Sequence, residues 1–492
     1  MPTILHLSDL HRSNSHPVSN NVLLDSIFSD IGRYASLQPS IHKCELVVVT
    51  GDLVSGTRTD DKNARDTLKE QYLQAKDFIL RLCKELLEGD LRRLFIIPGN
   101  HDVSFPASKD SMEEVDDVER YDVMEVLRQP ESPFRWSWKE LRLYSIRDVE
   151  QYTRRLASFK EFFDDLYKDL GRRFSLETHK QAMNFVTPDG SALFTGFSSL
   201  HGNDCFNRRG MISVEDVASN DLKVREAELN AIPLKVAFWH HNIEGFGYND
   251  DHMNSSEVLP HLIDHGYSIG LHGHQHRSQV VRYAYSLNPK LVMPVIASGS
   301  LCADPYDIPA GYRRQYNVIE IDGGRASVRV HVREWFEDRI WIGARLPEFG
   351  GNTYVDLKLP ILAEVLERSQ QQTDILTNQN LFAAEVAVRN RDYARAVVLL
   401  NSLPKNIVLV RRLLTDTYQM LGRWSDLVKH LEKPTNADEL ALIVDAELKL
   451  KDFAAAEKIL NSFANETGSY DELIKQLRKT LDSERKVAGR ID

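Results

Sequence analysis

The sequence has few cysteines and no long apolar run, and each absence excludes a class of protein. The four cysteines show no CxxC spacing, which predicts buried thiols in a reducing compartment and argues against a disulfide framework. No stretch approaches the ~18 consecutive apolar residues that a membrane span requires. The first residues, MPTILHLSDLHR, lack the cationic leader and apolar segment of a secretory signal. We therefore expect a cytoplasmic protein with no membrane segment.

A strong positive charge is also missing. The 61 Lys and Arg residues are outnumbered by 72 Asp and Glu residues, and the formal net charge of -11 argues against a dominant basic surface for nucleic acid. The 492 residues, 42% of them hydrophobic, are enough for two or three ordinary domains. Histidine, by contrast, is concentrated in one region. Eight of the 17 histidines lie between residues 240 and 276: His240, His241, His252, His261, His265, His272, His274 and His276.

The first hundred residues alternate short apolar runs with segments of helical periodicity. Thr3–Leu7, Leu46–Thr50 and Leu94–Ile97 are predicted strands, and Asn21–Ala35 and Ala64–Leu87 are predicted helices. This order favours parallel strands covered by helices. Later predicted strands are more closely spaced, which favours antiparallel hairpins in a second sheet packed on the first. They cover Ala192–Phe197, Lys235–Trp239, Ile269–His272, Val280–Tyr285, Val292–Ala297, Asn317–Ile321 and Ser327–Val332.

Residues 104–181, approximately, form a predicted insertion with a helical pattern. It interleaves aromatic and basic side chains, which can stack on bases and follow the phosphates of a nucleotide or a single-stranded nucleic acid. The alternative is a helical cap whose aromatic residues form its own core and whose cations face water. The aromatic and basic residues are Phe134, Arg135, Trp136, Trp138, Lys139, Arg142, Tyr144 and Arg147. Further along, Asn203, Asp204, Arg208 and Arg209 are candidate substrate contacts or ordinary loop residues.

The C-terminal part has a different organisation. A stretch with proline and glycine predicts a linker over residues 346–370, after a first domain of residues 1–345. Residues 371–492 are predicted to be helical, with a weak repeat near 30 residues that resembles tetratricopeptide-type repeats. An irregular helical bundle is the alternative. The repeat places Tyr393, Trp424 and Phe453 at helix starts and Leu400, Leu431 and Leu460 seven positions later.

Polar clusters follow the predicted strands or lie beside them at five places. Each cluster alone is uninformative, because an Asp after a Gly usually marks a turn and a pair of histidines is common. Their order and shared position are informative, because open α/β sheets bind ligands at the carboxyl ends of their strands. The clusters are Asp9-Leu10-His11, Gly51-Asp52, Gly99-Asn100-His101-Asp102, His240-His241 and Gly273-His274-Gln275-His276.

These clusters resemble, in order, the DxH, GD, GNHD or GNHE, isolated His and GHxH motifs of the calcineurin-like metallophosphoesterase superfamily. The resemblance covers roughly residues 1–335. It implies an α/β fold, a four-layer α-β-β-α sandwich with a helical insertion, which the all-α helical-repeat domain would follow. It also implies two divalent ions about 3.5–4 Å apart. Asp9, His11 and His276 would bind one ion, Asn100, His240 and His274 the other, and Asp52 would bridge them.

The resemblance further implies hydrolysis of a phosphate ester through attack by a metal-bridging hydroxide. Manganese is the first candidate for the ions, with iron, zinc, nickel and magnesium as alternatives that a mixed nitrogen and oxygen site accepts. His101 would protonate the leaving oxygen, with Asp102 orienting its ring and raising its pKa, or would be a simple hydrogen-bonding neighbour of the ligands. His241 either contacts substrate phosphate or packs, and His272 is expected to be a buried strand residue. His252, His261 and His265 are predicted surface residues.

Three functions remain open from the sequence. The leading one is a phosphodiesterase acting on a nucleotide or a nucleic-acid-like ester, and a DNA exonuclease or endonuclease similar to the repair nucleases of the superfamily is the alternative enzyme. A scaffold or regulatory subunit is the non-enzymatic alternative. The C-terminal helices are expected to bind a protein partner or a second copy of the chain. The salt dependence of substrate binding distinguishes the two enzymatic alternatives. A nuclease that touches many phosphates binds its substrate much more weakly as the salt concentration rises, whereas an enzyme for a small nucleotide does not.

Overall fold

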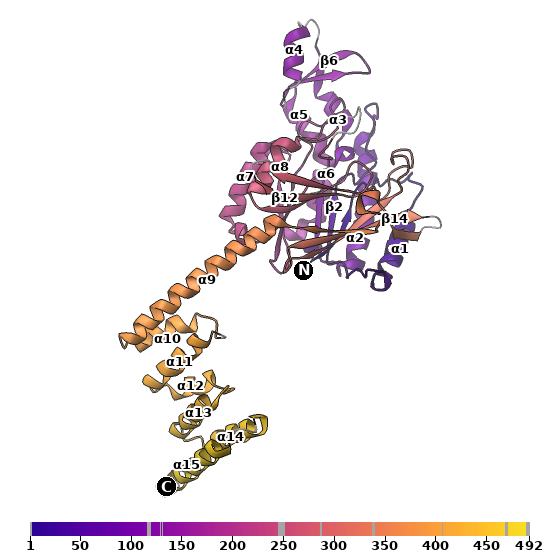
Figure 1. Ribbon diagram of the computed structural model, residues 1–492. Helices are drawn as coiled ribbons and strands as arrows, with labels where there is room; N and C mark the ends of the chain where they lie inside the picture. Colours follow the sequence, from indigo (N-terminus) through magenta and orange to yellow (C-terminus); the bar gives the residue numbers. More distant parts are fainter. Residues whose placement is uncertain are drawn as a thin grey trace. The chain divides into compact units, whose positions relative to one another are not determined.

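The computed structural model describes residues 2–115, 120–127, 129, 131–244, 251–285, 288–336, 340–405, 407–467 and 471–488. The chain divides into two compact units, Met1–Leu366 and Glu367–Asp492. The first unit combines β-sheets with helices, and the described residues of the second unit are helical (Figure 1). The predicted order of an α/β region followed by an all-α region is confirmed.

Seven strands form the first sheet, in the order β15-β14-β13-β1-β2-β3, with β16 also paired to β14. β1, β2 and β3 are parallel, whereas β13 runs antiparallel to β1. Every residue of β1, β2 and β3 is buried, which is typical of parallel strands covered on both faces. The strands are β1 (Thr3–Leu7), β2 (Leu46–Thr50), β3 (Leu94–Ile97), β13 (Gln315–Asp322), β14 (Ser327–Phe336), β15 (Ile340–Gly343) and β16 (Tyr354–Lys358).

Helices α1 (Asn20–Ile31) and α2 (Ala64–Leu86) pack on this sheet. α1 begins after Ser19, whose hydroxyl accepts a hydrogen bond from the backbone N–H of Val22 and so caps the helix. Its apolar residues Leu23, Leu24 and Ile27 are completely buried in the same cluster as the strand residues of β1 and β2. The helix that was predicted to reach residue 35 ends at Ile31.

Six strands form the second sheet, in the order β11-β12-β10-β9-β8-β7. Side chains of β9 (Leu234–Phe238) alternate, because Val236 and Phe238 join the core shared with the first sheet while Ala237 joins a cluster with helices α7 (Val214–Glu226) and α8 (Ser255–Asp264). This alternation gives the expected α-β-β-α layers. The other strands are β7 (Met183–Val186), β8 (Ala192–Gly196), β10 (Tyr267–His272), β11 (Gln279–Tyr285) and β12 (Asn288–Ala297).

The antiparallel hairpins predicted for the second sheet are mostly wrong. β8, β9, β10 and β12 are parallel, and only the edge strands β7 and β11 pair in antiparallel fashion. The connection length explains the difference, because α7 and α8 each cross over between successive parallel strands. The predicted hairpin of β13 and β14 exists, but it extends the first sheet.

The insertion over residues 104–181 is only partly helical, which corrects the prediction for it. Its central part is a three-stranded antiparallel sheet in the order β4-β6-β5. In β5, Arg135 and Ser137 are buried while Phe134 and Trp136 are half-buried, so burial alternates with the period of a strand. The elements are α3 (Phe105–Asp110), β4 (Met112–Glu114), α4 (Arg120–Leu127), β5 (Phe134–Ser137), β6 (Arg142–Ile146), α5 (Val149–Thr153) and α6 (Ala157–Leu166).

The linker predicted over residues 346–370 is also corrected. Strand β16 lies within this range and pairs with β14. Pro360 then opens the long helix α9 (Pro360–Arg389), in a position where the missing N–H of proline has no helical partner to lose. Ile361 and Leu362 are buried in clusters of the first unit. The core of the first unit therefore continues past the turn at residues 350–351.

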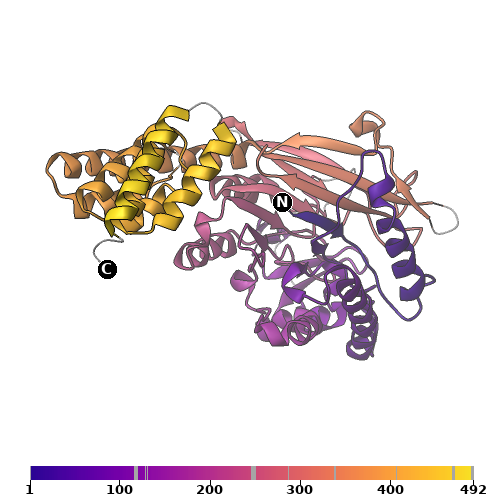
Figure 2. The ribbon, with the colours of Figure 1, turned by 90° about the horizontal axis from the view of Figure 1, so that it is seen from below.

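Helices α10 to α15 follow, each packed against the next along the chain (Figure 2). Three of them begin after the same turn, in which Arg391, Gly422 and Lys451 have φ values of 58°, 62° and 61°. The next residue in each turn donates its N–H to a carbonyl five positions earlier, at 2.8–2.9 Å, which closes the preceding helix. The helices are α10 (Tyr393–Asn401), α11 (Val408–Met420), α12 (Trp424–His430), α13 (Ala437–Lys449), α14 (Phe453–Thr467) and α15 (Asp471–Ala488).

The three predicted helix starts at Tyr393, Trp424 and Phe453 are correct. The leucines that follow them by seven positions, Leu400, Leu431 and Leu460, are completely buried in one cluster. The resemblance to tetratricopeptide repeats stays a prediction.

Candidate metal centre

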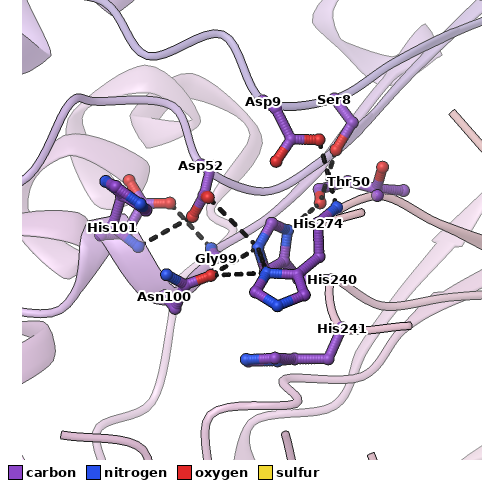
Figure 3. Close-up of polar contacts among 12 residues, drawn as sticks. Ser8, Asp9, Thr50, Asp52, Gly99, Asn100, His101, His240, His241 and His274 are labelled. Carbon is purple, nitrogen blue, oxygen red and sulfur yellow. Dashed lines mark hydrogen bonds and ion pairs between the residues drawn. The ribbon is translucent and has the colours of Figure 1, made fainter. Parts of the chain in front are cut away.

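The loops after β1, β2, β3, β9 and β10 meet at the carboxyl ends of the two sheets (Figure 3). After β1 and β2 the chain segments continue side by side, with the N–H of Asp9 and of His11 donating to the carbonyls of Gly51 and Asp52 at 3.1 and 3.0 Å. After β9 and β10, the carbonyl of His240 accepts from the N–H of Gly273 at 3.0 Å. The predicted clusters are therefore brought to one place.

Five of the predicted ligand residues have a left-handed backbone. They are Asp9 (φ 52°), His11 (44°), Asp52 (52°), His274 (69°) and His276 (54°). Such conformations cost of order 1–3 kcal/mol each and persist only where the surrounding structure enforces them. Asp and His adopt them more readily than most residues do. Backbone strain concentrated in this way is typical of a functional site.

Asp9, His11, Asp52 and His276 form one buried group of potential ligand atoms, all within 4.8 Å of one another. His276 Nε2 lies 3.3 Å from Asp9 Oδ1 and 3.4 Å from His11 Nε2. His11 Nε2 lies 3.9 Å from Asp52 Oδ2. The Nδ1 atom of His276 is 2.8 Å from the carbonyl of Asp307, to which it donates, so Nε2 is the nitrogen that faces the carboxylates.

Asp52, His240 and His274 form a second group, and Asn100 lies against it. His240 Nε2 is 3.3 Å from Asp52 Oδ2, and Asn100 Oδ1 is 2.9 Å from both His240 Nε2 and His274 Nδ1. The Nδ1 atom of His240 is 2.7 Å from the Thr50 carbonyl, so it donates there and Nε2 faces the group. Two imidazole nitrogens and an amide oxygen therefore converge beside one carboxylate.

His274 faces the centre through Nδ1, whereas His240 and His276 face it through Nε2. The Nε2 atom of His274 lies 3.2 Å from Asp251 Oδ2, which leaves Nδ1 toward Asn100. Asp251 was not predicted as a site residue, because it lies in a polar stretch without a strand or motif to single it out. A carboxylate beside a ligating histidine fixes the ring and raises its basicity. Asp251 therefore fixes the orientation of the His274 ring.

Asp52 belongs to both groups, and its electrostatic surroundings are unusual. Burial raises its pKa, but the imidazoles of His240 and His101 outweigh this and hold the pKa well below its usual range. Burial lowers the pKa of His240, but the Asp52 carboxylate outweighs it and raises the pKa to about 9. His276 likewise holds the pKa of Asp9 low in spite of burial. Both carboxylates therefore remain anionic at neutral pH and attract cations.

The donor set fits divalent ions. Oδ1 of Asp9 is buried and has no hydrogen-bond donor among the described residues. Carboxylate, amide and imidazole donors are the ligands that manganese, iron and zinc accept in mixed sites. A cavity of about 410 Å³ borders both groups, with Asp52, Asn100, His101 and His274 in its walls. This cavity is large enough for a phosphate and the groups attached to it.

His101 lies beside the carboxylate that both groups share. Its backbone N–H donates to Asp52 Oδ1 at 2.8 Å, and its ring Nδ1 is 2.8 Å from the carbonyl of Ser55. Because Nδ1 must donate to that carbonyl, Nε2 is the ring nitrogen that can face a ligand in the 410 Å³ cavity.

Asp102 does not orient the ring of His101, so that prediction is wrong. Its buried carboxylate accepts hydrogen bonds from the Tyr72 hydroxyl and the Gly99 N–H at 2.8 Å, and from the Leu53 N–H at 3.3 Å. Asp102 ends a single turn of 3-10 helix, so its side chain diverges from that of the preceding residue. Burial raises the pKa of Asp102 to about 7. Its contacts hold the strand-end loops together.

The histidines next to the motifs pack in the interior. His241 is completely buried, with Nδ1 2.9 Å from Ser199 Oγ and its ring 4.6 Å from that of His274. Of the two roles left open for His241, these contacts show packing. His272 is buried as predicted and stacks on Trp239.

Asp204 anchors the insertion to the rest of the first unit. Its Oδ2 accepts from Arg135 Nε at 2.6 Å and from the Tyr152 hydroxyl at 2.7 Å, and all three residues are buried. Arg135 is therefore neither a phosphate contact nor a solvated cation, as the two predictions had it. Two neighbouring arginines are also in ion pairs, Arg142 with Glu114 and Arg147 with Glu113.

A second cavity, of about 1160 Å³, lies between part of the insertion and the segments that follow β8 and β9. Trp136 and Trp138 line it from the insertion, and Met211 and His252 line it from the other side. His252 follows Asp251, which borders the smaller cavity, so the two cavities flank one segment of the chain. The prediction of an ordinary surface position for His252 is corrected by this placement.

The sequence matches the calcineurin-like phosphoesterase family over residues 2–278, a range that contains all seven predicted metal ligands. The chain belongs to the calcineurin-like phosphoesterase family. Among solved structures it is similar to GAP50, the anchor in the inner membrane complex of Plasmodium, with 10% identity, 73% of this chain and 88% of that chain covered, and a TM-score of 0.32. It is also similar to TT1561 of Thermus thermophilus, with 11% identity, coverage of 65% and 93%, and a TM-score of 0.29. No curated protein matches the chain.

Calcineurin-like phosphoesterases usually bind two divalent metal ions, and the two buried groups that share Asp52 are suited to hold them. The four cysteines of the chain are not in disulfides, and Cys44, Cys83 and Cys302 are buried. Within the described residues, no helix has both the length and the apolar character needed to cross a membrane. The cytoplasmic location stays a prediction.

Proposed function

We propose that this calcineurin-like phosphoesterase is a dinuclear-metal-dependent phosphodiesterase acting on a nucleotide or a nucleic-acid-like ester. The observation that carries the proposal is the buried carboxylate of Asp52, which faces His11 on one side and His240 on the other. Two nearby cations repel each other, and a carboxylate between them offsets that repulsion. Asp9, His11 and His276 are the proposed ligands of one ion, Asn100, His240 and His274 those of the other, and Asp52 the bridge.

Each side chain has a defined task in the proposed reaction. Two divalent ions, when bound, supply positive charge that polarises the phosphoryl group and activates water at neutral pH. His240 and His276 keep Nε2 toward the ions because their Nδ1–H groups donate to backbone carbonyls. His101, with Nδ1 committed to the Ser55 carbonyl, presents Nε2 to the cavity and is the proposed donor of a proton to the leaving oxygen. Asp102 keeps the loop of His101 in place.

The second cavity supports a diester with a bulky leaving group. Its 1160 Å³ exceeds what a small monoester occupies, and the rings of Trp136 and Trp138 can stack on a base. Extended contact with a DNA backbone has less support, because Arg135, Arg142 and Arg147 are already paired with carboxylates. Manganese is the proposed first choice of metal, and iron, zinc, nickel and magnesium are tested beside it.

One panel of assays tests this proposal. Protein reconstituted with each metal is given a chromogenic monoester, a chromogenic diester, cyclic nucleotides, single-stranded DNA and duplex DNA. We expect the diester and the nucleotide to be hydrolysed best, with turnover that changes little between 50 and 200 mM salt. Preference for DNA together with a steep loss in salt would replace the proposal with the nuclease. No turnover with any substrate or metal would favour the non-enzymatic scaffold.

We further propose that the C-terminal helices recruit a protein partner or a second copy of the chain. Large apolar side chains are exposed on them, with Val408 82%, Val398 71% and Met420 67% accessible. Cutting the chain after Leu366 keeps β16 and the whole first unit. Such a chain should hydrolyse the chromogenic diester at the full-length rate. A folded truncation that has lost turnover would contradict a role limited to recruitment.

A further inference from the structure

A third group of metal-binding side chains lies outside the Asp52 site. Glu131, His179 and His201 each offer one ligand atom, and these atoms are within 4.8 Å of one another. Glu131 lies between α4 and β5 in the middle of the insertion and His179 lies near its C-terminal end, whereas His201 follows strand β8 in the second sheet. Residues that are far apart in the sequence therefore bring two imidazoles and a carboxylate together.

The distances suit one ion with tetrahedral ligands. His201 Nε2 is 3.5 Å from Glu131 Oε1, and the ring centroids of His179 and His201 are 5.6 Å apart with an angle of 40° between the rings. Zinc binds nitrogen and oxygen ligands at about 2.0–2.2 Å, which places two ligand atoms of a tetrahedral site about 3.4 Å apart. The pair of His201 and Glu131 already has this separation. The ligand atom of His179 lies within 4.8 Å of both.

His179 is oriented as a ligating histidine would be. Its Nδ1 is 2.8 Å from Ser213 Oγ, and that hydroxyl donates its proton to Glu215 Oε2 at 3.0 Å. Because the serine proton is used, Nδ1 must be the donor to Ser213, and Nε2 of a neutral ring then carries the lone pair. An imidazole whose other N–H is held by an oxygen that is itself hydrogen-bonded is the usual arrangement around a metal.

His201 faces Glu131 through Nε2. Its side chain is only 11% exposed, so an ion held at Nε2 would be partly shielded from water. His201 also lines the 1160 Å³ cavity, so an ion bound to it would have that space on one side.

We propose that Glu131, His179 and His201 bind one zinc-class divalent ion that fastens the insertion to the loop after β8. Two imidazoles and one carboxylate are a donor set that zinc accepts while keeping a fourth position for water or a ligand. The proposed metal ion would add a second link between the insertion and the loop after β8, which the salt bridge of Arg135 and Asp204 already joins. The site does not depend on the Asp52 centre, with which it shares no side chain.

Zinc titration of the metal-stripped full-length chain tests this proposal. His179→Gln and Glu131→Gln are suitable variants, because these side chains are 48% and 62% exposed and their replacement leaves the core intact. His261→Gln is the matched control, an exposed histidine on α8. Equilibrium dialysis with elemental analysis gives the zinc equivalents, and hydrogen exchange follows residues 131–146 with and without zinc.

We expect both variants to lose one equivalent of zinc, or to bind it at least tenfold more weakly, while the control binds as wild type does. Zinc should slow hydrogen exchange in residues 131–146 of the wild type and not in His179→Gln. In Asp52→Asn protein, this equivalent should remain. Unchanged zinc binding in both variants would overturn the proposal, and so would its loss in Asp52→Asn, since that would place the equivalent in the Asp52 centre.

Discussion

Replacing Asp52 by asparagine should remove most of the metal-dependent turnover proposed for this protein without unfolding it. Asparagine has the same shape, and its amide oxygen can still accept the hydrogen bond that the His101 N–H gives to Oδ1. What the substitution removes is the negative charge between the two ligand groups. Oδ2, which is 3.3 Å from His240 Nε2 and 3.9 Å from His11 Nε2, becomes an NH₂ group that cannot bind a cation.

The size of the effect follows from Coulomb's law. Two unit charges 4 Å apart interact by about 4 kcal/mol at an effective dielectric of 20, so a divalent ion and a carboxylate interact by about 8 kcal/mol. If the substitution removes only a quarter of this interaction energy, the loss is about 2 kcal/mol for each ion. A loss of that size weakens the binding of each ion by roughly 30-fold. Because the carboxylate serves two ions, occupancy of the pair falls by roughly 10³-fold at limiting metal.

The assay is hydrolysis of a chromogenic diester over a metal titration, together with the metal content of the dialysed protein. Asp60→Asn is the control, because Asp60 is exposed and belongs to neither ligand group. Circular dichroism and thermal unfolding of the metal-free variant show whether it folds. Wild-type turnover with two ions retained in Asp52→Asn would refute the assignment of a shared carboxylate.

Three further variants test other parts of the structure. His101→Ala should lower diester turnover by roughly 10²-fold with the metal content unchanged; metal lost in proportion to turnover would make His101 structural instead. Asp251→Asn should weaken binding of the ion assigned to His274 by roughly 10–100-fold in a metal titration, and unchanged affinity would contradict its positioning role. Glu439→Gln should destabilise the C-terminal unit by about 2 kcal/mol at pH 7, because Arg411 hydrogen-bonds to Glu439 at 2.7 and 2.9 Å and lowers its pKa to about 2. This stability is present above the unfolded-state pKa and is lost as the pH falls toward 2, so urea denaturation should separate wild type from variant at pH 7 and not at pH 2.

The strand ends and their motifs were predictable because two local rules agree there. The short, continuously apolar run Leu46–Thr50 predicted the bounds of β2, and the position of Asp52 two residues after that run placed it at the carboxyl edge. The spacing of His274 and His276 around a single residue brought both rings to the centre. The ion ligands themselves stay a prediction until metals are measured.

Other features depended on partners that the sequence does not reveal. Arg135 is buried because Asp204, 69 residues away, accepts its hydrogen bond in the interior. Asp102 turned away from His101 because Tyr72 and two backbone N–H groups hold its carboxylate. Parallel pairing in the second sheet required knowing that α7 and α8 cross over it. Contacts between distant residues decided each of these cases.

The repeated turn in the C-terminal unit has a consequence for protein engineering and for natural variation. Gly422 adopts the left-handed conformation without penalty, whereas Arg391 and Lys451 reach the same φ with a Cβ atom that disfavours it by about 1 kcal/mol. The two residues with side chains occupy the same place in the turn that Gly422 fills. The helical unit is therefore less stable than its own backbone permits, and glycine at residues 391 and 451 is the smallest change that would recover the difference.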